Sequence, residues 1–313
     1  MNPENKQGNV LVIGSINMDL VVGVDKIPEI GETRIGRFFH QHPGGKGANQ
    51  AVAAARLDTN VAMIGCVGKD VFGEQLCDRL EQEEINVSGI MKVADFSSGT
   101  ATITVDQHAN NFIVVAPGAN GQLKCQQINH NVALIEWADL VVLQLEIPVE
   151  TVEYAVNLAK NAGKPVLLNL APYHQLNKKT LSSLDYLVLN KVEAQALLNI
   201  KSDRITDLVE GLKDFQATHV FLTLGEEGAI HVYNNQYVKY DAYRVNALDT
   251  TGAGDSFIGA LACQIVKGIP LDNAVRFATK ASAVTVTKLG AQDSLPYMDD
   301  IHEFDKKLKG RVR

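Results

Sequence analysis

The chain has 313 residues, a formal net charge of −7 and 46% hydrophobic residues. A chain of this length and apolar content can bury one large α/β core with a small appendage. Its acidic balance gives no overall attraction for a polyanion, so we expect no nucleic acid partner.

The cysteines and the apolar runs indicate the cellular compartment of the protein. Four cysteines, at positions 66, 77, 125 and 263, lie far apart and form no Cys-x-x-Cys pair. This spacing is typical of reduced thiols rather than of a disulfide framework or a zinc site. The first residues, MNPENKQGN, are polar, and no apolar run reaches the roughly 18 residues that span a bilayer. We therefore expect a cytoplasmic protein with no signal peptide and no membrane segment.

Short apolar runs alternate along the chain with longer segments of helical periodicity. The runs are NVLVIGS (9–15), NVAMIG (60–65), DLVVLQL (139–145), PVLLNL (165–170), YLVLN (186–190) and HVFLTLG (219–225). The helical segments are 47–57, 71–84, 149–163, 191–200 and 205–215. Nearly continuous apolar runs are typical of parallel strands that are buried on both faces. The alternation predicts a doubly wound α/β fold with a mainly parallel central sheet flanked by helices.

Two segments depart from this alternation. Residues 33–45 and 99–115 change between apolar and polar in period two, which predicts antiparallel hairpins outside the main sheet. Ligands of open α/β sheets bind at the carboxyl ends of the strands, where a small β element would act as a lid. We expect a single α/β domain over residues 1–313, with a β lid formed by about 16–45 and 98–116. An exposed lid also predicts a homodimer in which two lids cover each other's apolar faces and edges.

The first polar set follows the first strand, in GSINMDL (14–20). Asn17 and Asp19 are two residues apart, so an extended segment points them to the same side. An amide and a carboxylate on one side can bind neighbouring hydroxyls of a polyol, although the same pair is also common in turns. Glu146 ends the strand in LQLEIP, where a buried acid needs a partner or a ligand.

The second set is HPGGKGANQAVAAARL (42–57), in which glycines surround Lys46 just before an Ala-rich helix. It is not a P-loop, because Lys46 is followed by Gly47 rather than by Ser or Thr. It is not a dinucleotide motif either, because a long insert separates it from the first strand. The glycines could serve only to let the helix pack closely on the sheet. Lys46 and Asn49 are about one helical turn apart and could bind hydroxyls on one face.

The third set is DTTGAGDSF (249–257), which precedes an apolar helical stripe. Gly252, Ala253 and Gly254 open this helix, and a helix start exposes N–H groups and the positive end of the helix dipole. Glycines let an anion come close to those groups, as a transferring phosphate requires. The alternative is that Asp255 only caps the helix. Capping alone does not require glycines on both sides of Ala253.

Two of these stretches resemble a known family. PGGKGANQAVAAARLD together with VGKDVFG is similar to the amino-terminal signature of the PfkB carbohydrate kinases, and DTTGAGDSFIGAL is similar to their carboxy-terminal signature. Their order and spacing match over nearly the whole chain. Within the family, GSINMDL, GGKGANQA, QLEIP and KLGAQDS most resemble the members that phosphorylate ribose.

The resemblance implies transfer of phosphate from ATP to the 5-hydroxyl of D-ribose, with Asp255 as the catalytic base. It implies that the ribose is bound by Asn17, Asp19, Gly45, Lys46, Asn49, Glu146 and Asp255, and that the anion hole is formed by Gly252, Ala253 and Gly254. It implies an ATP site at Asn190, Glu193, Thr223, Gly225, Gly254 and Thr279, with Glu193 acting on magnesium through water. It implies an activating potassium ion at Asp249, Thr251, Thr285, Lys288, Gly290 and Ser294. Thr279 departs from the family, because relatives often carry His or Asn there, near the adenine.

Two other functions stay open at this stage. The substrate could be another furanose, such as deoxyribose, fructose or a nucleoside. Asn17, Asp19 and Glu146 favour a small free sugar, because a nucleoside would need an apolar pocket for its base beside them. The chain could also be a sugar sensor without catalysis, but an intact Asp255 and glycine turn argue against that.

Overall fold

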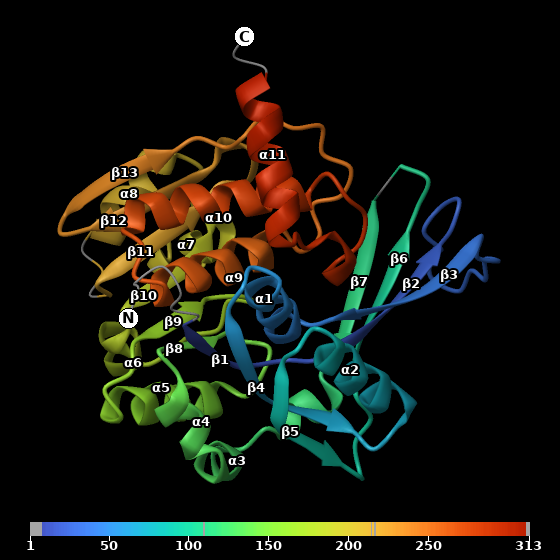
Figure 1. Cartoon of the computed structure of the whole chain (residues 1–313). Helices are drawn as coiled ribbons and strands as arrows, with labels where there is room; N and C mark the ends of the chain where they lie inside the picture. Colours follow the sequence, from blue (N-terminus) through green and yellow to red (C-terminus); the bar gives the residue numbers. More distant parts are fainter. Residues whose placement is uncertain (1–7, 109, 214, 216, 311–313) are drawn as a thin grey trace.

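The computed structural model describes residues 8–108, 110–213, 215 and 217–310. The polar start of the chain, on which the expectation of no signal peptide depends, therefore lies almost entirely outside the described residues. Within them, the strands form a nine-stranded sheet and a separate four-stranded sheet (Figure 1).

The nine-stranded sheet confirms the predicted fold class. Its order is β13-β12-β11-β10-β9-β8-β1-β4-β5, and the pairs from β11 to β5 are parallel. Only β12 and β13, at one edge, are antiparallel. The strands are β1 (Asn9–Ile13), β4 (Asn60–Gly68), β5 (Asn86–Val93), β8 (Leu140–Leu143), β9 (Val166–Asn169), β10 (Tyr186–Asn190), β11 (His219–Thr223), β12 (Ala229–Tyr233) and β13 (Gln236–Tyr240).

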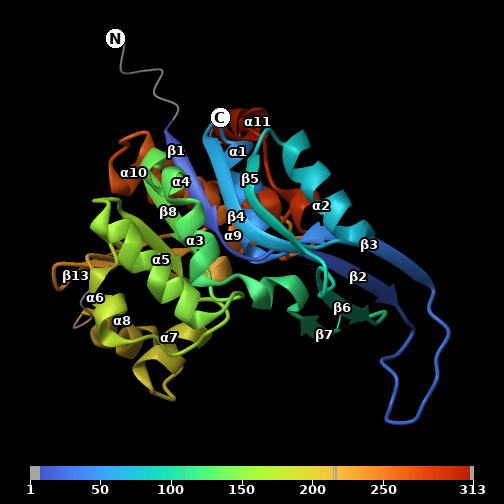
Figure 2. The same ribbon diagram turned by 90° about the horizontal axis from the view of Figure 1, so that it is seen from below.

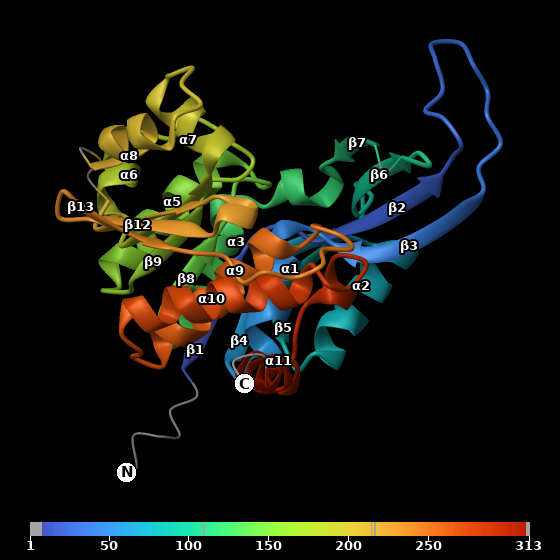
Figure 3. The same ribbon diagram turned by 90° about the horizontal axis from the view of Figure 1, so that it is seen from above.

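Helices cover both faces of this sheet (Figures 2 and 3). One apolar core lies under α1 (Lys46–Ala55), α2 (Val71–Gln82), α9 (Ala253–Val266), α10 (Leu271–Thr285) and α11 (Met298–Gly310). The other lies under α3 (Cys125–His130), α4 (Val132–Trp137), α5 (Val149–Asn161), α6 (Lys178–Ser183), α7 (Lys191–Leu198) and α8 (Ile205–Lys213). Successive residues of a strand serve opposite cores: Val10 and Val12 belong to the first, and Leu11 and Ile13 belong to the second.

Helices α1 and α9 lie against each other on the first face (Figure 3). Small residues permit this contact, because a Cβ atom added at Gly259 of α9 would lie 2.9 Å from the carbonyl oxygen of Gln50 in α1. The two helices carry the second and third polar sets of the sequence. The close packing therefore brings the starts of these two helices to one place.

The segments predicted to form a lid make the separate four-stranded sheet, which we call the lid. Its order is β3-β2-β6-β7, formed by β2 (Asn17–Gly23), β3 (Phe38–Gly44), β6 (Gly99–Val105) and β7 (Asn111–Ala116). Residues 99–115 form the expected antiparallel hairpin. Residues 33–45 do not form a hairpin of their own, because their strand β3 pairs with β2 instead. The lid is mixed, since β2 and β6 run parallel.

The lid projects from the body, and the loop between β2 and β3 extends furthest (Figures 2 and 3). Its surface is apolar: four consecutive residues of the edge strand β7, 112–115, are each at least 49% exposed. Phe38 and Phe39 of β3 are exposed as well. No helix among the described residues has the length and apolarity that crossing a membrane requires.

Candidate active site

Glu146, which follows β8, links the first two polar sets. Its Oε2 accepts hydrogen bonds from the hydroxyl of Ser15 (2.5 Å) and from the backbone N–H of Lys46 (3.1 Å). Ser15 follows β1, and Lys46 begins α1. One half-buried carboxylate thus connects the ends of two neighbouring strands to the start of a helix.

Asn17 and Asp19 both lie in β2, at the base of the lid, as the two-residue spacing predicted. The Oδ1 atom of Asn17 accepts a hydrogen bond of 2.7 Å from Asn120 Nδ2, and the Oδ1 atom of Asn120 in turn accepts one from the N–H of Ile16. Gly45 lies directly against this segment. It has a φ of 88°, and a Cβ atom there would lie 2.8 Å from the backbone nitrogen of Asn17. Only glycine fits this junction between lid and helix.

Asp255 is in the first turn of α9 and is buried. Its carboxylate accepts hydrogen bonds of 2.9 Å from Asn49 Nδ2 and of 2.9 Å from Gln50 Nε2, both in α1. Two amide donors therefore fix the orientation of this carboxylate. Burial raises the pKa of Asp255, against the opposing effects of the Lys46 charge and of these two amides.

The amides behind Asp255 form a chain that the sequence analysis missed. Gln144 donates to Gln50 Oε1 (2.7 Å), and Gln50 donates also to Asn169 Oδ1 (3.1 Å). Gln50 and Gln144 stand inside motifs quoted above, and Asn169 ends a predicted strand. A buried amide at the end of such a strand was the available signal. By contrast, the Oδ1 atom of Asn49 is buried without a hydrogen-bond partner among the described residues, so it is free to accept from a hydroxyl.

The glycine turn presents free donors beside Asp255. Gly252 is the N-cap of α9, with a φ of 78°. The backbone N–H groups of Gly254 and Asp255 make no hydrogen bond to the described residues, and the space beside the Cα of Gly254 is open. A helix start with open space in front of it can accept an anionic group.

The charges of this site oppose one another. Burial, together with the charges of Glu146 and Asp255, raises the pKa of Asp19 to about 7. Burial works to lower the pKa of Lys46, but the carboxylates of Asp255, Glu146 and Glu193 outweigh it and raise that pKa. The Lys46 ammonium is thus the cation that these acids share.

A cavity of about 230 Å³ joins the two halves of the site. It is lined by Lys46 and Asp255 on one side, by Asn190 and Glu193 on the other, and by Gly252 and Gly254 between them. Asn190 caps α7 and exchanges hydrogen bonds with Glu193, whose two carboxylate oxygens accept from Asn190 N (2.7 Å) and Asn190 Nδ2 (3.0 Å). The Asn-x-x-Glu pattern is therefore a helix start and also part of the cavity wall.

A second cavity, of about 600 Å³, adjoins the first through Thr223, Thr250 and Gly254. Gly225, with a φ of 59°, and Thr279 also line it. Thr279 is buried, and its hydroxyl donates to the carbonyl of Val275 in its own helix (2.9 Å). The walls are mainly apolar, and the volume falls in the range of small-molecule sites.

A third cavity, of about 380 Å³, lies beside Asn17 and Glu146. Most of its wall is apolar, and Val115 of the lid and Pro148 belong to it. A nucleoside would need an apolar pocket for its base beside these residues, and this cavity is such a pocket. The residues around it therefore do not by themselves favour a free sugar over a nucleoside.

The predicted cation residues are partly brought together. Asp249 accepts hydrogen bonds from Thr251 N (2.9 Å), from the Thr251 hydroxyl (2.7 Å) and from Gly290 N (2.9 Å). Thr285 and Lys288 form a turn, in which Lys288 N donates to the carbonyl of Thr285 (3.0 Å).

The remaining contacts of this region leave the cation site incomplete. The Lys288 ammonium lies 3.0 Å from an oxygen of Asp300, and Ser294 donates to the carbonyl of Ala291. The hydrogen bonds and ion pairs found for Thr285, Lys288 and Ser294 within the described residues do not include Asp249. No group of three or more His, Cys, Asp or Glu side chains in the described ranges is arranged to hold a metal.

Comparison with known proteins gives consistent matches over the whole chain. Residues 7–298 match the model of the pfkB family carbohydrate kinases. The ribokinase of Schizosaccharomyces pombe is 39% identical over 94% of this chain and 96% of its own length, and the deoxyribokinase of Salmonella typhi is 37% identical over 95% and 98%. The structure of Arabidopsis thaliana ribokinase complexed with ribose and ATP superposes with a TM-score of 0.89, at 25% identity, over 95% of this chain and 98% of that one.

Proposed function

The chain belongs to the pfkB family of carbohydrate kinases, and on that basis we propose that it is a ribokinase, which transfers the γ-phosphoryl group of ATP to the 5-hydroxyl of D-ribose. The observation that carries the proposal is the position of Asp255. This carboxylate lines the smaller cavity together with Lys46, at the start of a helix, and that cavity adjoins the larger, mainly apolar one.

The sugar occupies the side of the site formed by the first two polar sets. Asn17, Asp19, Lys46 and Glu146 bind its hydroxyls, together with the backbone at Gly45. Asn49 also contributes, because its unpaired oxygen can accept from a hydroxyl while its nitrogen holds Asp255. The lid, residues 16–45 and 98–116 of a single domain over 1–313, covers the bound sugar and excludes water.

Asp255 is the general base. It takes the proton of the 5-hydroxyl as that oxygen forms a bond to the γ-phosphorus, and the bond from the γ-phosphorus to the leaving oxygen of ADP breaks in line. The turn of Gly252, Ala253 and Gly254 forms an anion hole that stabilises the charge on the transferring group. Its free donors include the N–H groups of Gly254 and Asp255, whereas the N–H of Ala253 already donates to the carbonyl of Thr250 (3.2 Å). Positioning and electrostatics therefore supply most of the rate enhancement.

ATP lies along the two adjoining cavities, with its phosphates near Asn190 and its nucleoside near Thr223, Gly225 and Thr279. Glu193 would hold magnesium through water, which fits the structure because both of its carboxylate oxygens already accept hydrogen bonds from Asn190. Magnesium bound in this way neutralises charge on the phosphates of ATP.

An activating potassium ion would be held in the loop beside the anion hole. The site comprises Asp249, Thr251, Thr285, Lys288, Gly290 and Ser294. A carboxylate and backbone carbonyls are hard oxygen donors of the kind that potassium accepts. The ion would add positive field at the turn.

The apolar surface of the lid supports a homodimer, and the free thiols support a cytoplasmic location. Exposed apolar residues on the edge strand β7 favour a homodimer in which two lids pack together. The cysteines form no disulfide, and Cys66, Cys77 and Cys263 are buried, which is consistent with the cytoplasm.

A coupled ADP-release assay tests the reaction and the substrate. It uses MgATP with ribose, 2-deoxyribose, fructose or adenosine, each with potassium or with sodium alone. We expect ribose to give the highest kcat/KM and potassium to raise it. Higher turnover with 2-deoxyribose or adenosine would move the substrate assignment, and ribose binding without turnover on any sugar would favour a sensor.

Asp255→Asn tests the base in the same assay. The substitution keeps the size of the side chain but removes the proton acceptor, so we expect kcat to fall by about 10²- to 10⁴-fold with ribose binding nearly intact. Ribose affinity is measured by isothermal titration. Turnover close to that of the unchanged protein would refute the assignment of Asp255.

A further inference from the structure

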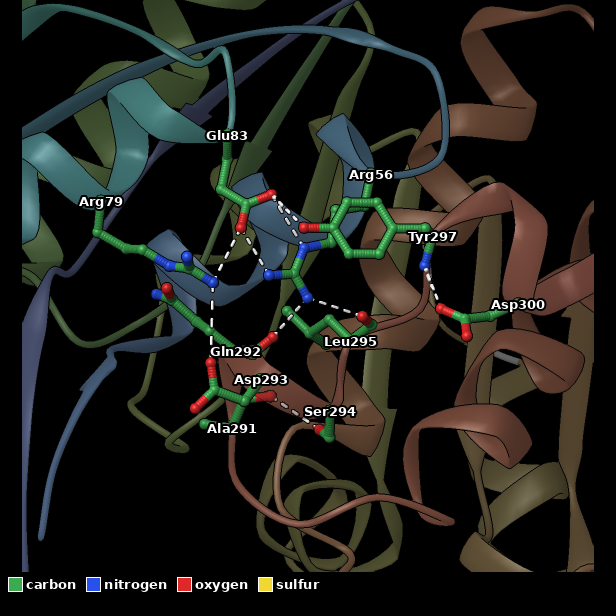
Figure 4. A network of polar contacts seen from close by, with 10 residues as sticks. All are labelled: Arg56, Arg79, Glu83, Ala291, Gln292, Asp293, Ser294, Leu295, Tyr297 and Asp300. Carbon is green, nitrogen blue, oxygen red and sulfur yellow. Dashed lines mark hydrogen bonds and ion pairs between the residues drawn. The ribbon is translucent and has the colours of Figure 1, made fainter.

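The side chain of Arg56 connects three separate segments of the chain (Figure 4). Arg56 follows the last residue of α1, and its side chain is only 3% exposed. Its guanidinium donates from Nε and Nη2 to the two carboxylate oxygens of Glu83 after α2, at 2.9 and 2.6 Å. Its Nη1 donates to the carbonyl oxygens of Gln292 (2.7 Å) and Leu295 (2.8 Å).

The two carbonyls belong to residues 290–295, which we call the strap. The strap includes the short 3₁₀ turn η4 (Gln292–Ser294) and is part of no sheet. Inside it, the hydroxyl and the N–H of Ser294 donate to the carbonyl of Ala291, at 2.8 and 3.3 Å. From outside the strap, the guanidinium of Arg56 donates to the carbonyl oxygens of residues 292 and 295. The Arg56 guanidinium thus holds the backbone of the strap, while Arg79 contacts only the side chain of Asp293, at 3.7 Å.

The opposite side of the strap touches the glycine turn. Gly290 N donates to Asp249, which also accepts from Thr251, the residue just before Gly252. A Cβ atom at Gly252 would lie 3.2 Å from the carbonyl oxygen of Ala291. The strap therefore adjoins the anion hole at two points, and a displacement of the strap moves the atoms against which the turn is packed.

The stability of the fold does not by itself explain why an ion pair, rather than two apolar side chains, occupies the positions of Arg56 and Glu83. A buried ion pair gains little over well-packed apolar side chains of the same volume, because both charges must leave water. Burial works to raise the pKa of Glu83, but the hydrogen bonds and charge of Arg56 lower it, so the carboxylate stays ionised. An apolar pair could fill the space, but it could not fix two carbonyls of the strap.

We propose that Arg56 is a positioning residue for phosphoryl transfer: with Glu83 as its counter-ion, it fixes the strap, and the strap fixes the anion hole. The inference rests on the proposed function. It assigns Arg56 no contact with sugar or nucleotide. It concerns the geometry of the turn during transfer, where a misplacement of about 1 Å can cost on the order of 10²-fold in rate.

Two variants separate positioning from folding. Arg56→Met with Glu83→Leu removes both charges of the pair together and preserves volume. Arg79 then loses its contact with Glu83 (3.0 Å), but it is 28% exposed and keeps Asp293 at 3.7 Å, so no fully buried charge is left without a partner. Arg56→Lys keeps the positive charge but loses the planar fork, and it can hold only part of the contacts. The matched control is Lys160→Met, which breaks a partly buried ion pair with Asp185 (2.6 Å) that makes no contact with the strap.

The first measurement is steady-state kinetics with ribose and MgATP. For the double variant we expect kcat to fall by about 10- to 100-fold with the ribose KM changed by less than about two-fold. Arg56→Lys should give an intermediate loss, and Lys160→Met should keep the unchanged kcat. A double variant that folds and keeps its kcat would overturn the proposal, as would a loss confined to KM.

The second measurement is hydrogen exchange, which needs no turnover. The amides of Gly290 and Ser294 are hydrogen-bonded and should exchange faster in the double variant, while amides of α5 keep their rates. Unchanged exchange over 290–295 would overturn the tether. If the unchanged protein phosphorylates no sugar, the proposed function fails on its own, and the exchange result still decides whether Arg56 holds the strap.

Discussion

Replacing Asp19 with Asn should stabilise the free protein, because the site holds this carboxylate at the expense of stability. In the unfolded chain Asp19 has its ordinary pKa of 3.8, and in the folded protein burial with Glu146 and Asp255 raises that pKa to about 7. Below pH 3.8 the group is protonated in both states, so folding meets no charge penalty. Above pH 7 it is ionised in both states, and the folded protein carries the full penalty.

The size of the effect follows from the two pKa values. One pKa unit corresponds to about 1.4 kcal/mol, so the difference between 3.8 and about 7 amounts to about 4 kcal/mol at pH 8. At pH 5 only the part between 3.8 and 5 applies, or about 2 kcal/mol. Because Asp19 is only partly buried, solvent screens its charge and these figures are upper limits. Asparagine has the same shape and no charge, so Asp19→Asn should recover much of this free energy.

Urea unfolding at pH 5 and pH 8 measures the effect. The variant should gain more stability at pH 8 than at pH 5, and isothermal titration should find its affinity for ribose reduced. The control is Asp25→Asn, at an exposed carboxylate of the lid, which should change the unfolding free energy by less than about 0.5 kcal/mol. A gain that is equal at both pH values, or no gain at pH 8, would refute the reasoning.

Two further substitutions test the base and the lid. Gln50→Met removes one of the two amide donors that oppose the raised pKa of Asp255, so that pKa should rise further and the acid limb of the kcat profile should move to higher pH. We expect a roughly three- to ten-fold loss of kcat at pH 6 and a smaller loss at pH 8, and a uniform loss at all pH values would contradict this mechanism. Phe112→Ser with Val114→Lys makes the exposed edge strand β7 polar, so sedimentation equilibrium should find a dimer in the unchanged protein and a monomer in the variant. Equal masses for the two proteins would rule out the lid as the dimer surface.

Much of the main sheet could be predicted because its central strands are apolar on both faces. Five of the six predicted runs contain a strand of the sheet, and the sixth, 60–65, lies within the longer β4. Buried parallel strands are apolar on both faces, so their sequences show no polar alternation. The strands β5 and β12 were missed, and β13 lies in the segment 236–247, which is β-like in sequence but was not assigned to the main sheet. In β5 exposed and buried positions alternate irregularly, and β12 carries a buried histidine, His231, so neither reads as an apolar run.

The lid and the site were predictable to different degrees. Period-two alternation identifies a strand but not its partner, so the pairing of β3 with β2 could not be foreseen. Asp255 and Lys46 could be predicted from the glycines and acids at helix starts, because the packing of a helix alone seldom requires these residue types there. The chain of Gln50, Gln144 and Asn169, and the tether at Arg56, use residue types that are ordinary in helices and strands. Their roles depend on contacts between distant segments, which sequence patterns do not report.

The packing of α9 on α1 determines the order in which the parts of the site can form while the chain is synthesised. The bonds from Asn49 and Gln50 to Asp255 span 206 and 205 residues of sequence. At a synthesis rate of about 5–20 residues per second, roughly 10–40 seconds pass between making the amides and making the carboxylate that they hold. Throughout that interval α1 lacks the helix that covers it. The half of the site that we propose binds the sugar is therefore synthesised first, and the site is complete only when nearly the whole chain has been made.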